Sequence, residues 1–204
     1  RIRHAAAQAG RPVAIMQDLQ GPRLRTGRLR NPGGVALAAG GSITIAPGDF
    51  PGDAERIGAN YEGLWRDVRP GDRILLSDGL VELKVAQVEP PQVCCEVVVG
   101  GLLEERRGMN LPGVKPSIST PTDKDLSDLA FGIERGVDYV ALSFVRAPSD
   151  LLRLRQEIAR RGADLPVIAK IERPEAVDAL EAIMERADGV MVARGDLGIE
   201  MPTE

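Results

Sequence analysis

The sequence contains few cysteine, histidine or aromatic residues. Its 204 residues include two cysteines, one histidine and 3% aromatics. The chain therefore lacks the ligands for a cysteine- and histidine-based metal cluster, and His4, in a polar helical stretch, is interpreted as a surface residue. Cys94 and Cys95 are neighbours in an apolar strand pattern, where side chains alternate between faces, so we expect two reduced structural thiols and no disulfide bond.

Long apolar runs, basic clusters and a Walker-type phosphate loop are also absent. No run reaches the roughly 18 apolar residues of a membrane span, and the first residues do not resemble a signal peptide. The net charge is −4, and no run of basic residues indicates a nucleic-acid surface. With 43% apolar and 27% charged residues, the composition is typical of a globular protein. We expect a cytoplasmic protein with neither membrane nor nucleic-acid partners.

The chain has three parts of different texture. Residues 1–27 contain the end of a helix, an apolar strand and a loop. Residues 28–115 contain short β-rich runs separated by Gly and Pro, and the Asp78-Gly79 pair predicts a hairpin within them. Residues 116–204 alternate regularly between apolar strands and amphipathic helices, which indicates parallel βα units.

The first and last parts predict strands and helices of typical length. Thr122, with Asp125 three residues later, predicts a helix cap, and Gly136 predicts where that helix stops. We expect helices over 122–136, 149–162 and 174–187, and strands over 12–19, 137–145, 166–172 and 189–196. Parallel βα units form either a closed barrel or a doubly wound sheet, and in both architectures ligands bind at the carboxyl ends of the strands.

Polar residues interrupt the predicted strands at that functional end. They are Asp18, Ser143, Lys170, Glu172 and Asp196. Lys170 and Glu172 are two residues apart, so both are expected on the same side of the strand. Glu172 and Asp196 end successive strands and provide two carboxylates, which suit a hard cation such as Mg²⁺. Lys170 would supply positive charge for an anion or a developing enolate.

Two loops add candidate anion-binding groups. Arg23 and Arg25 follow the first strand, and Arg25 is well placed to hold a phosphate. The turn that begins at Arg194 is expected to offer backbone N–H groups to a carboxylate. Simpler interpretations remain open at this point, because Lys170 and Glu172 could form a structural ion pair and Asp196 could cap a helix. Their position at the same end of adjacent strands favours a ligand site.

Five segments together resemble the pyruvate kinase family. They are DLQGPRLRTG, GDRILLSDGLVELKV, RRGMNLPGV, IAKIERPEAV and DGVMVARGDLGIEMP, in order along essentially the whole chain. The resemblance implies part of a (β/α)₈ TIM barrel, about four βα units, with an inserted small all-β lid domain. The barrel would comprise residues 1–27 and 116–204, and the lid residues 28–115. The implied activity is the glycolytic transfer of a phosphoryl group from phosphoenolpyruvate to ADP, giving pyruvate and ATP.

The resemblance also implies roles for individual residues. Lys170 would lie at the transferred phosphoryl group, and Arg25 would grip that group. Glu172 and Asp196 would bind Mg²⁺, for which Mn²⁺ is an alternative.

Further roles concern substrate binding. The backbone amides of Gly195 and Asp196 would bind the substrate carboxylate. Ser143 and Phe144 would lie near the pyruvate carbon skeleton, and Asp78 would approach the site when the lid closes.

The loop after the first strand bears on monovalent cations. Potassium-dependent members of the family carry glutamate where this chain has Arg23, and potassium-independent members carry lysine there, preceded by Leu-Gln. Here Asp18, Leu19, Gln20 and Arg23 form this region. We expect the guanidinium to replace the cation, so that K⁺ is not required.

Three further expectations concern the whole protein. The chain begins at Arg1 and ends at Glu204, and the resemblance implies a fragment that is inactive alone and belongs to a homotetramer when full length. One alternative is a metal-dependent aldolase or lyase of the phosphoenolpyruvate/pyruvate-binding barrels, against which the β-rich insertion argues. The other is a noncatalytic paralogue or binding module, against which the retention of Lys170, Glu172 and Asp196 argues.

Overall fold

The computed structural model describes residues 1–201, which form two compact units. The first, here called the α/β unit, comprises Arg1–Pro22 and Ser119–Leu197. The second, the β unit, comprises Arg23–Ile118 together with residues 198–201. Within residues 1–201, no helix is both long and apolar enough to cross a membrane.

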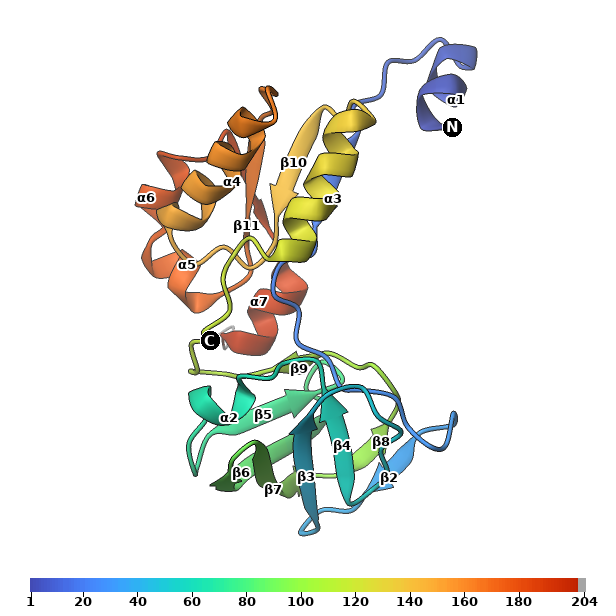
Figure 1. Cartoon of the computed structure of the whole chain (residues 1–204), viewed down its shortest axis with the longest axis vertical. Helices are drawn as coiled ribbons and strands as arrows, with labels where there is room; N and C mark the ends of the chain where they lie inside the picture. Colours follow the sequence, from blue (N-terminus) through green and yellow to red (C-terminus); the bar gives the residue numbers. More distant parts are fainter. Residues whose placement is uncertain (202–204) are drawn as a thin grey trace. The chain divides into compact units, whose positions relative to one another are not determined.

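A four-stranded parallel sheet forms the centre of the α/β unit. Its strands are β1 (Met16–Leu19), β10 (Tyr139–Leu142), β11 (Val167–Ile171) and β12 (Gly189–Val192), in that order across the sheet. Each strand pairs with the next strand of this sheet along the chain. The connection from β1 to β10 contains the β unit and then a helix, and helices alone connect β10 to β11 and β11 to β12 (Figure 1). The predicted parallel βα units are therefore confirmed.

Two long helices pack against this sheet. Helix α3 (Asp123–Glu134) contacts β1, and α4 (Pro148–Arg160) contacts β11. The predicted cap of α3 is confirmed, because the Thr122 side chain accepts a hydrogen bond from the Asp125 N–H and Asp125 accepts one from the Thr122 N–H. Gly136 follows with a φ of +65°, a conformation that glycine adopts without strain.

The third predicted helix divides into two. Helix α5 (Pro174–Asp178) and helix α6 (Leu180–Met184) are separated at Ala179, whose φ is −100° and ψ is 16°. The expectation of one helix over 174–187 was therefore wrong. Apolar residues with helical spacing continue across the break, so the sequence pattern does not reveal it. Two short helices complete the set, α1 (Ile2–Gln8) and α7 (Arg194–Glu200). The last strand ends at Val192, so the Arg-Gly-Asp sequence begins α7 and does not extend β12.

The apolar core of the α/β unit lies between the sheet and its helices. Leu19, Val140 and Ala169 are fully buried from the strands, and Leu129 and Leu154 from the helices. The side chains of Asp18 and Lys170 contact one another and are more exposed than these neighbours. Helix packing on one side of the strands therefore leaves the other side available for polar groups at the strand ends.

The β unit contains a six-stranded sheet and a two-stranded one. The strands are β2 (Val35–Leu37), β3 (Ser42–Pro47), β4 (Arg56–Ala59), β5 (Arg73–Leu76), β6 (Val81–Glu89), β7 (Gln92–Val99), β8 (Gly101–Leu103) and β9 (Met109–Asn110). The larger sheet has the order β4-β3-β7-β6-β5-β9, and β2 pairs with β8. A short helix, α2 (Leu64–Asp67), accompanies them. The predicted hairpin joins β5 to β6, with Ser77 and Asp78 at positive φ.

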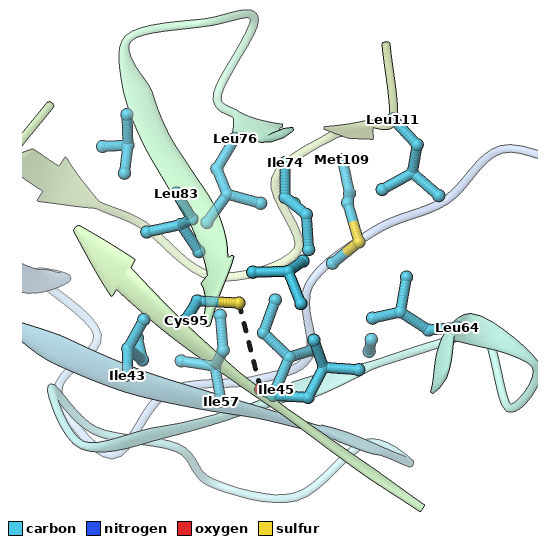
Figure 2. Packing of buried hydrophobic residues seen from close by; sticks show 14 of the residues in the cluster. Ile43, Ile45, Ile57, Leu64, Ile74, Leu76, Leu83, Cys95, Met109 and Leu111 are labelled. Carbon is cyan, nitrogen blue, oxygen red and sulfur yellow. Dashed lines mark hydrogen bonds between the residues drawn. The ribbon is translucent and has the colours of Figure 1, made fainter. Parts of the chain in front are cut away.

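Branched aliphatic side chains fill the core of the β unit. Figure 2 shows Ile43, Ile45 and Ile57 facing Leu83 and Cys95. These side chains are at most 2% exposed. Both cysteines are free, and Cys95 is buried while its neighbour is only partly so, as strand alternation predicts.

Candidate active site

Three polar side chains meet at the carboxyl end of the α/β sheet. The Lys170 ammonium in β11 donates to both carboxylate oxygens of Asp18, at 3.1 and 3.0 Å, and to the Ser143 hydroxyl at 2.9 Å. The Ser143 hydroxyl donates to Asp18 Oδ1 at 3.2 Å. Asp18 belongs to β1 and Ser143 directly follows β10, so three adjacent strand ends supply one cluster.

Glu172 joins this cluster from the residue after β11. One of its carboxylate oxygens lies 3.1 Å from Lys170 Nζ, and the other accepts the Phe144 N–H at 2.8 Å. Its side chain is 1% exposed. A buried carboxylate is tolerated only when it is paired or hydrogen-bonded, and here both oxygens are satisfied. Phe144 has a φ of 56°, a strained conformation of the kind that often occurs at functional sites.

The Lys170 ammonium is held as a positive charge. Burial of the side chain opposes protonation, but the hydrogen bonds to Asp18 and Glu172 and their charges outweigh it, so the pKa of Lys170 lies above its usual value. The side chain is only 13% exposed. A fixed cation with little water around it interacts strongly with a nearby anionic ligand.

Glu172 and Asp196 are the two carboxylates that the sequence predicts as Mg²⁺ ligands. Asp196 lies in the first turn of α7, partly buried, and no hydrogen bond or ion pair between described residues joins it to the Lys170 cluster. Within residues 1–201, no group of three or more His, Cys, Asp or Glu side chains gathers as a metal site. Carboxylate and hydroxyl oxygens are suitable donors, and Mg²⁺ commonly takes one or two carboxylates plus substrate and water oxygens. The donor chemistry therefore fits a cation shared with a substrate.

Helix α7 begins close to the end of the sheet. The Ala193 N–H donates to the Ile171 carbonyl at 3.1 Å, and the Leu197 N–H donates to the Ala193 carbonyl at 3.1 Å. Gly195 therefore lies in the first helical turn, where backbone N–H groups have no partner inside the helix. This local geometry is compatible with the predicted binding of a carboxylate.

The predicted arginines belong to the β unit. The Arg25 guanidinium donates to the Arg106 carbonyl at 2.9 Å, and the Arg25 backbone forms an isolated bridge with Gly108. The Asn60 side chain accepts the Arg25 N–H at 2.7 Å and donates to the Arg23 carbonyl at 3.0 Å. One side-chain amide therefore fixes the backbone on both sides of Leu24, between the two arginines.

The other predicted residues have contrasting environments. Asp78 is exposed at the turn between β5 and β6, with a φ of 57°. Leu19, expected in a monovalent-cation region, is 0% exposed in the apolar core, and its carbonyl accepts the Ser143 N–H at 3.2 Å. Asp18 from the same region directs its carboxylate at Lys170.

Sequence reasoning missed two supporting side chains. Asp125 was recognised only as part of a helix cap, although it also accepts the Gly21 N–H at 3.0 Å. Nothing in the sequence pattern distinguishes Asn60, because asparagine is common in polar turns. The contact between Asp18 and Lys170 joins residues 152 positions apart, which no local pattern reveals.

Comparisons with known proteins agree over the whole chain. The family model described as pyruvate kinase, barrel domain, matches residues 1–204. Pyruvate kinases of Corynebacterium efficiens and Mycobacterium tuberculosis are 44% and 45% identical over 203 and 204 residues, covering all of this chain and 43% of each relative. Pyruvate kinase 2 of a Synechocystis strain is 46% identical over 206 residues and 35% of its own length.

A solved structure supports the same fold. A crystal structure of a pyruvate kinase from Cryptosporidium parvum superposes with a TM-score of 0.88 at 35% identity, over 99% of this chain and 43% of that one. The chain thus spans less than half the length of these relatives. Its parallel sheet is part of a (β/α)₈ barrel with an inserted β unit, and the chain belongs to the pyruvate kinase family.

Proposed function

We propose that this chain carries part of the active site of a pyruvate kinase, which transfers a phosphoryl group from phosphoenolpyruvate to ADP. The observation that carries the proposal is the Lys170 ammonium, held among Asp18, Ser143 and Glu172 at the carboxyl end of the sheet. In phosphoryl transfer the protein contributes mainly positioning and charge neutralisation. A buried ammonium in a hydrogen-bonded frame provides both.

In this proposal, residues of the α/β unit have separate roles in binding and charge neutralisation. Lys170 neutralises charge on the transferred phosphoryl group and on the enolate oxygen that remains. Ser143 and Phe144 lie near the carbon skeleton of the substrate, and the backbone amides at Gly195 and Asp196 receive its carboxylate. Mg²⁺, held by Glu172 and Asp196, would neutralise the phosphate and enolate oxygens when bound.

The β unit would act as a lid in this proposal. Arg25 grips the phosphoryl group with its planar guanidinium, a geometry that suits phosphate oxygens. Asp78, at the turn between β5 and β6, approaches the site on closure, and closure excludes water from the reaction.

Potassium independence is the finer part of the proposal. We infer that Arg23 supplies the positive charge that a monovalent cation provides in other members of the family. An arginine remains charged at any physiological pH and is part of the chain, so its positive charge would be present whichever monovalent cation is in solution. Activity is therefore expected with Na⁺ or K⁺ alike.

The setting of the enzyme follows the family. We propose a homotetramer in the cytoplasm, with phosphoenolpyruvate and ADP as substrates, Mg²⁺ or Mn²⁺ as cofactor, and no nucleic-acid or membrane partner. Light scattering of the complete gene product would give its mass and test the tetramer.

The decisive experiment is an assay of the complete gene product. Pyruvate formation from phosphoenolpyruvate and ADP is measured with Mg²⁺, in the presence and absence of K⁺, for the natural protein and for Lys170→Met. Loss of Lys170 should reduce kcat by about 10³-fold or more, as expected when a group that stabilises the transition state is removed. Pyruvate that forms without ADP would mean that the phosphoryl group is transferred to water, which would contradict a kinase. No pyruvate under any condition would support the lyase or the noncatalytic paralogue.

A further inference from the structure

The loop after β1 is fastened by a side chain from a distant part of the chain. The Asp125 carboxylate, on the first turn of α3, accepts the Gly21 N–H at 3.0 Å across 104 residues of sequence. Asp125 is 0% exposed. A buried carboxylate costs free energy unless it is fully hydrogen-bonded, so this contact is part of what makes its burial tolerable.

The same carboxylate also completes the helix cap. Its second oxygen accepts the N–H of Thr122 at 2.8 Å and the hydroxyl of Thr122 at 2.7 Å. Asp150 occupies the corresponding position on α4, and its carboxylate accepts the nearby N–H groups of Arg146 and Ala147, at 2.9 and 3.2 Å. Capping thus does not by itself require a remote partner, and the contact with Gly21 is an additional feature of Asp125.

Gly21 lies directly against the backbone of the site. A Cβ atom at this position would come within 2.6 Å of the Ser143 carbonyl, and the φ of Gly21 is +66°. On the same segment, the Leu19 carbonyl accepts the Ser143 N–H at 3.2 Å. The loop is therefore fitted between Asp125 on one side and Ser143 on the other, and the hydroxyl of Ser143 contacts both Asp18 and Lys170.

We propose that Asp125 is a positioning residue for the active site: through Gly21 it holds the end of β1 so that Asp18 and Ser143 keep the Lys170 ammonium in place. The inference rests on the proposed phosphoryl transfer, in which Lys170 acts on the substrate. Displacement of a catalytic group by about 1 Å can lower a rate about 100-fold.

Two variants separate positioning from capping. Asp125→Ala removes the contact with Gly21 but leaves the Thr122 hydroxyl free to accept the N–H of residue 125. Thr122→Ala removes that hydroxyl and leaves the carboxylate available to Gly21. In the complete gene product, we expect Asp125→Ala to lower kcat about 10- to 100-fold with KM changed less than about threefold. Thr122→Ala should destabilise the protein by about 1 kcal/mol, typical of a lost cap, with kcat within about twofold of the natural enzyme.

Amide hydrogen exchange provides a readout that does not depend on activity. The amides of residues 19–21 should exchange faster in Asp125→Ala and at the natural rate in Thr122→Ala. Should Asp125→Ala not fold, Asp125→Asn, which keeps side-chain volume and one acceptor oxygen, is compared with Thr122→Ala in the same way, with about a three- to tenfold loss of kcat expected. Equal kcat in the two variants, or unchanged exchange of the amides of residues 19–21, would overturn the proposal.

Failure of the proposed function would look different. An inactive natural protein would refute phosphoryl transfer, and the exchange of the amides of residues 19–21 would then decide alone whether Asp125 holds the loop.

Discussion

The two units differ in where they keep their charges. Among residues 1–201, the buried charged side chains are Asp125, Asp150, Glu172 and Arg173, and all four belong to the α/β unit. In the β unit, the buried polar side chains are Thr26 and Ser77, neither of them charged. The β unit is therefore stabilised mainly by apolar burial, whereas the α/β unit also bears the desolvation cost of its buried charges. Two of these charges, Asp125 and Asp150, cap helices, and Glu172 contacts Lys170.

Removing a core side chain of the β unit should give the largest change in stability. Leu83 is 0% exposed in β6, and Leu83→Ala is expected to lower the free energy of unfolding by about 4 kcal/mol through lost burial and a residual cavity. Leu80→Ala, at a side chain 74% exposed, is the matched control and should change little. Guanidinium unfolding gives the free energy, and hydrogen exchange shows which unit is affected. Equal loss of protection in both units would contradict independent cores.

Breaking the buried ion pair should have the next largest effect. Glu172→Gln keeps the shape but removes the charge that faces Lys170. We expect a loss of about 3 kcal/mol, at the low end for a broken buried pair, because Lys170 retains Asp18 as a partner. Glu181→Gln, on the exposed surface of α6, serves as control. A Glu172→Gln variant as stable as the natural protein in urea would show that the cluster is better solvated than its burial indicates.

A carboxylate at the opposite end of the sheet should give a smaller, pH-dependent effect. Asp188 accepts the Val167 N–H at 2.7 Å and pairs with Arg155 at 2.6 Å. The hydrogen bond from Val167, and then the pairing with Arg155, outweigh desolvation and hold the pKa of Asp188 below its usual value of 3.8. Because the folded state lowers this pKa, the stabilisation is present above 3.8 and is lost as the pH falls through the lower, folded value.

Asp188→Asn tests this directly. The variant should lose about 1 kcal/mol at neutral pH, since the pair is partly exposed and solvent weakens it. The thermal unfolding midpoint should also fall less steeply with acidification below pH 3.8 than in the natural protein. Parallel curves for the two proteins would mean that Asp188 does not contribute to acid sensitivity.

The smallest effect is expected at a surface ion pair of the β unit. Arg73 and Glu82 form two hydrogen bonds, at 2.7 and 3.0 Å, between side chains 54% and 20% exposed. Glu82→Gln should cost about 0.5 kcal/mol, because solvent screens such pairs, and less in high salt. Measuring Glu82→Gln beside Glu172→Gln compares the same substitution in the two environments. A larger loss for Glu82→Gln would reverse the contrast between the units.

Local features of the fold were predictable from the sequence. The cap at Thr122 and the turn at Asp78 depend on residues within a few positions, where side-chain chemistry determines backbone geometry. Strand periodicity and parallel topology predicted that Lys170 and Glu172 lie on the same side of their strand, at its carboxyl end. The break at Ala179 did not, because alanine favours helix and the apolar pattern continues through it.

Contacts between distant segments escaped prediction for a different reason. Lys170 binds Asp18 across 152 residues, and Gly21 binds Asp125 across 104. Which carboxylate faces which donor depends on how the strand ends and the loop pack, not on spacing along the chain. Sequence could therefore identify the members of the site, whereas their partners required the structure.

The buried thiol in the core of the β unit has a practical consequence. Burial, reinforced by its neighbour Cys94, raises the pKa of Cys95 to about 12, and the side chain is 2% exposed. Because thiolates are the species that react with alkylating reagents, Cys95 should be modified only when the β unit opens. In a Cys94→Ser background, the rate at which Cys95 is alkylated would therefore measure how often the β unit opens, at a single natural sulfur atom.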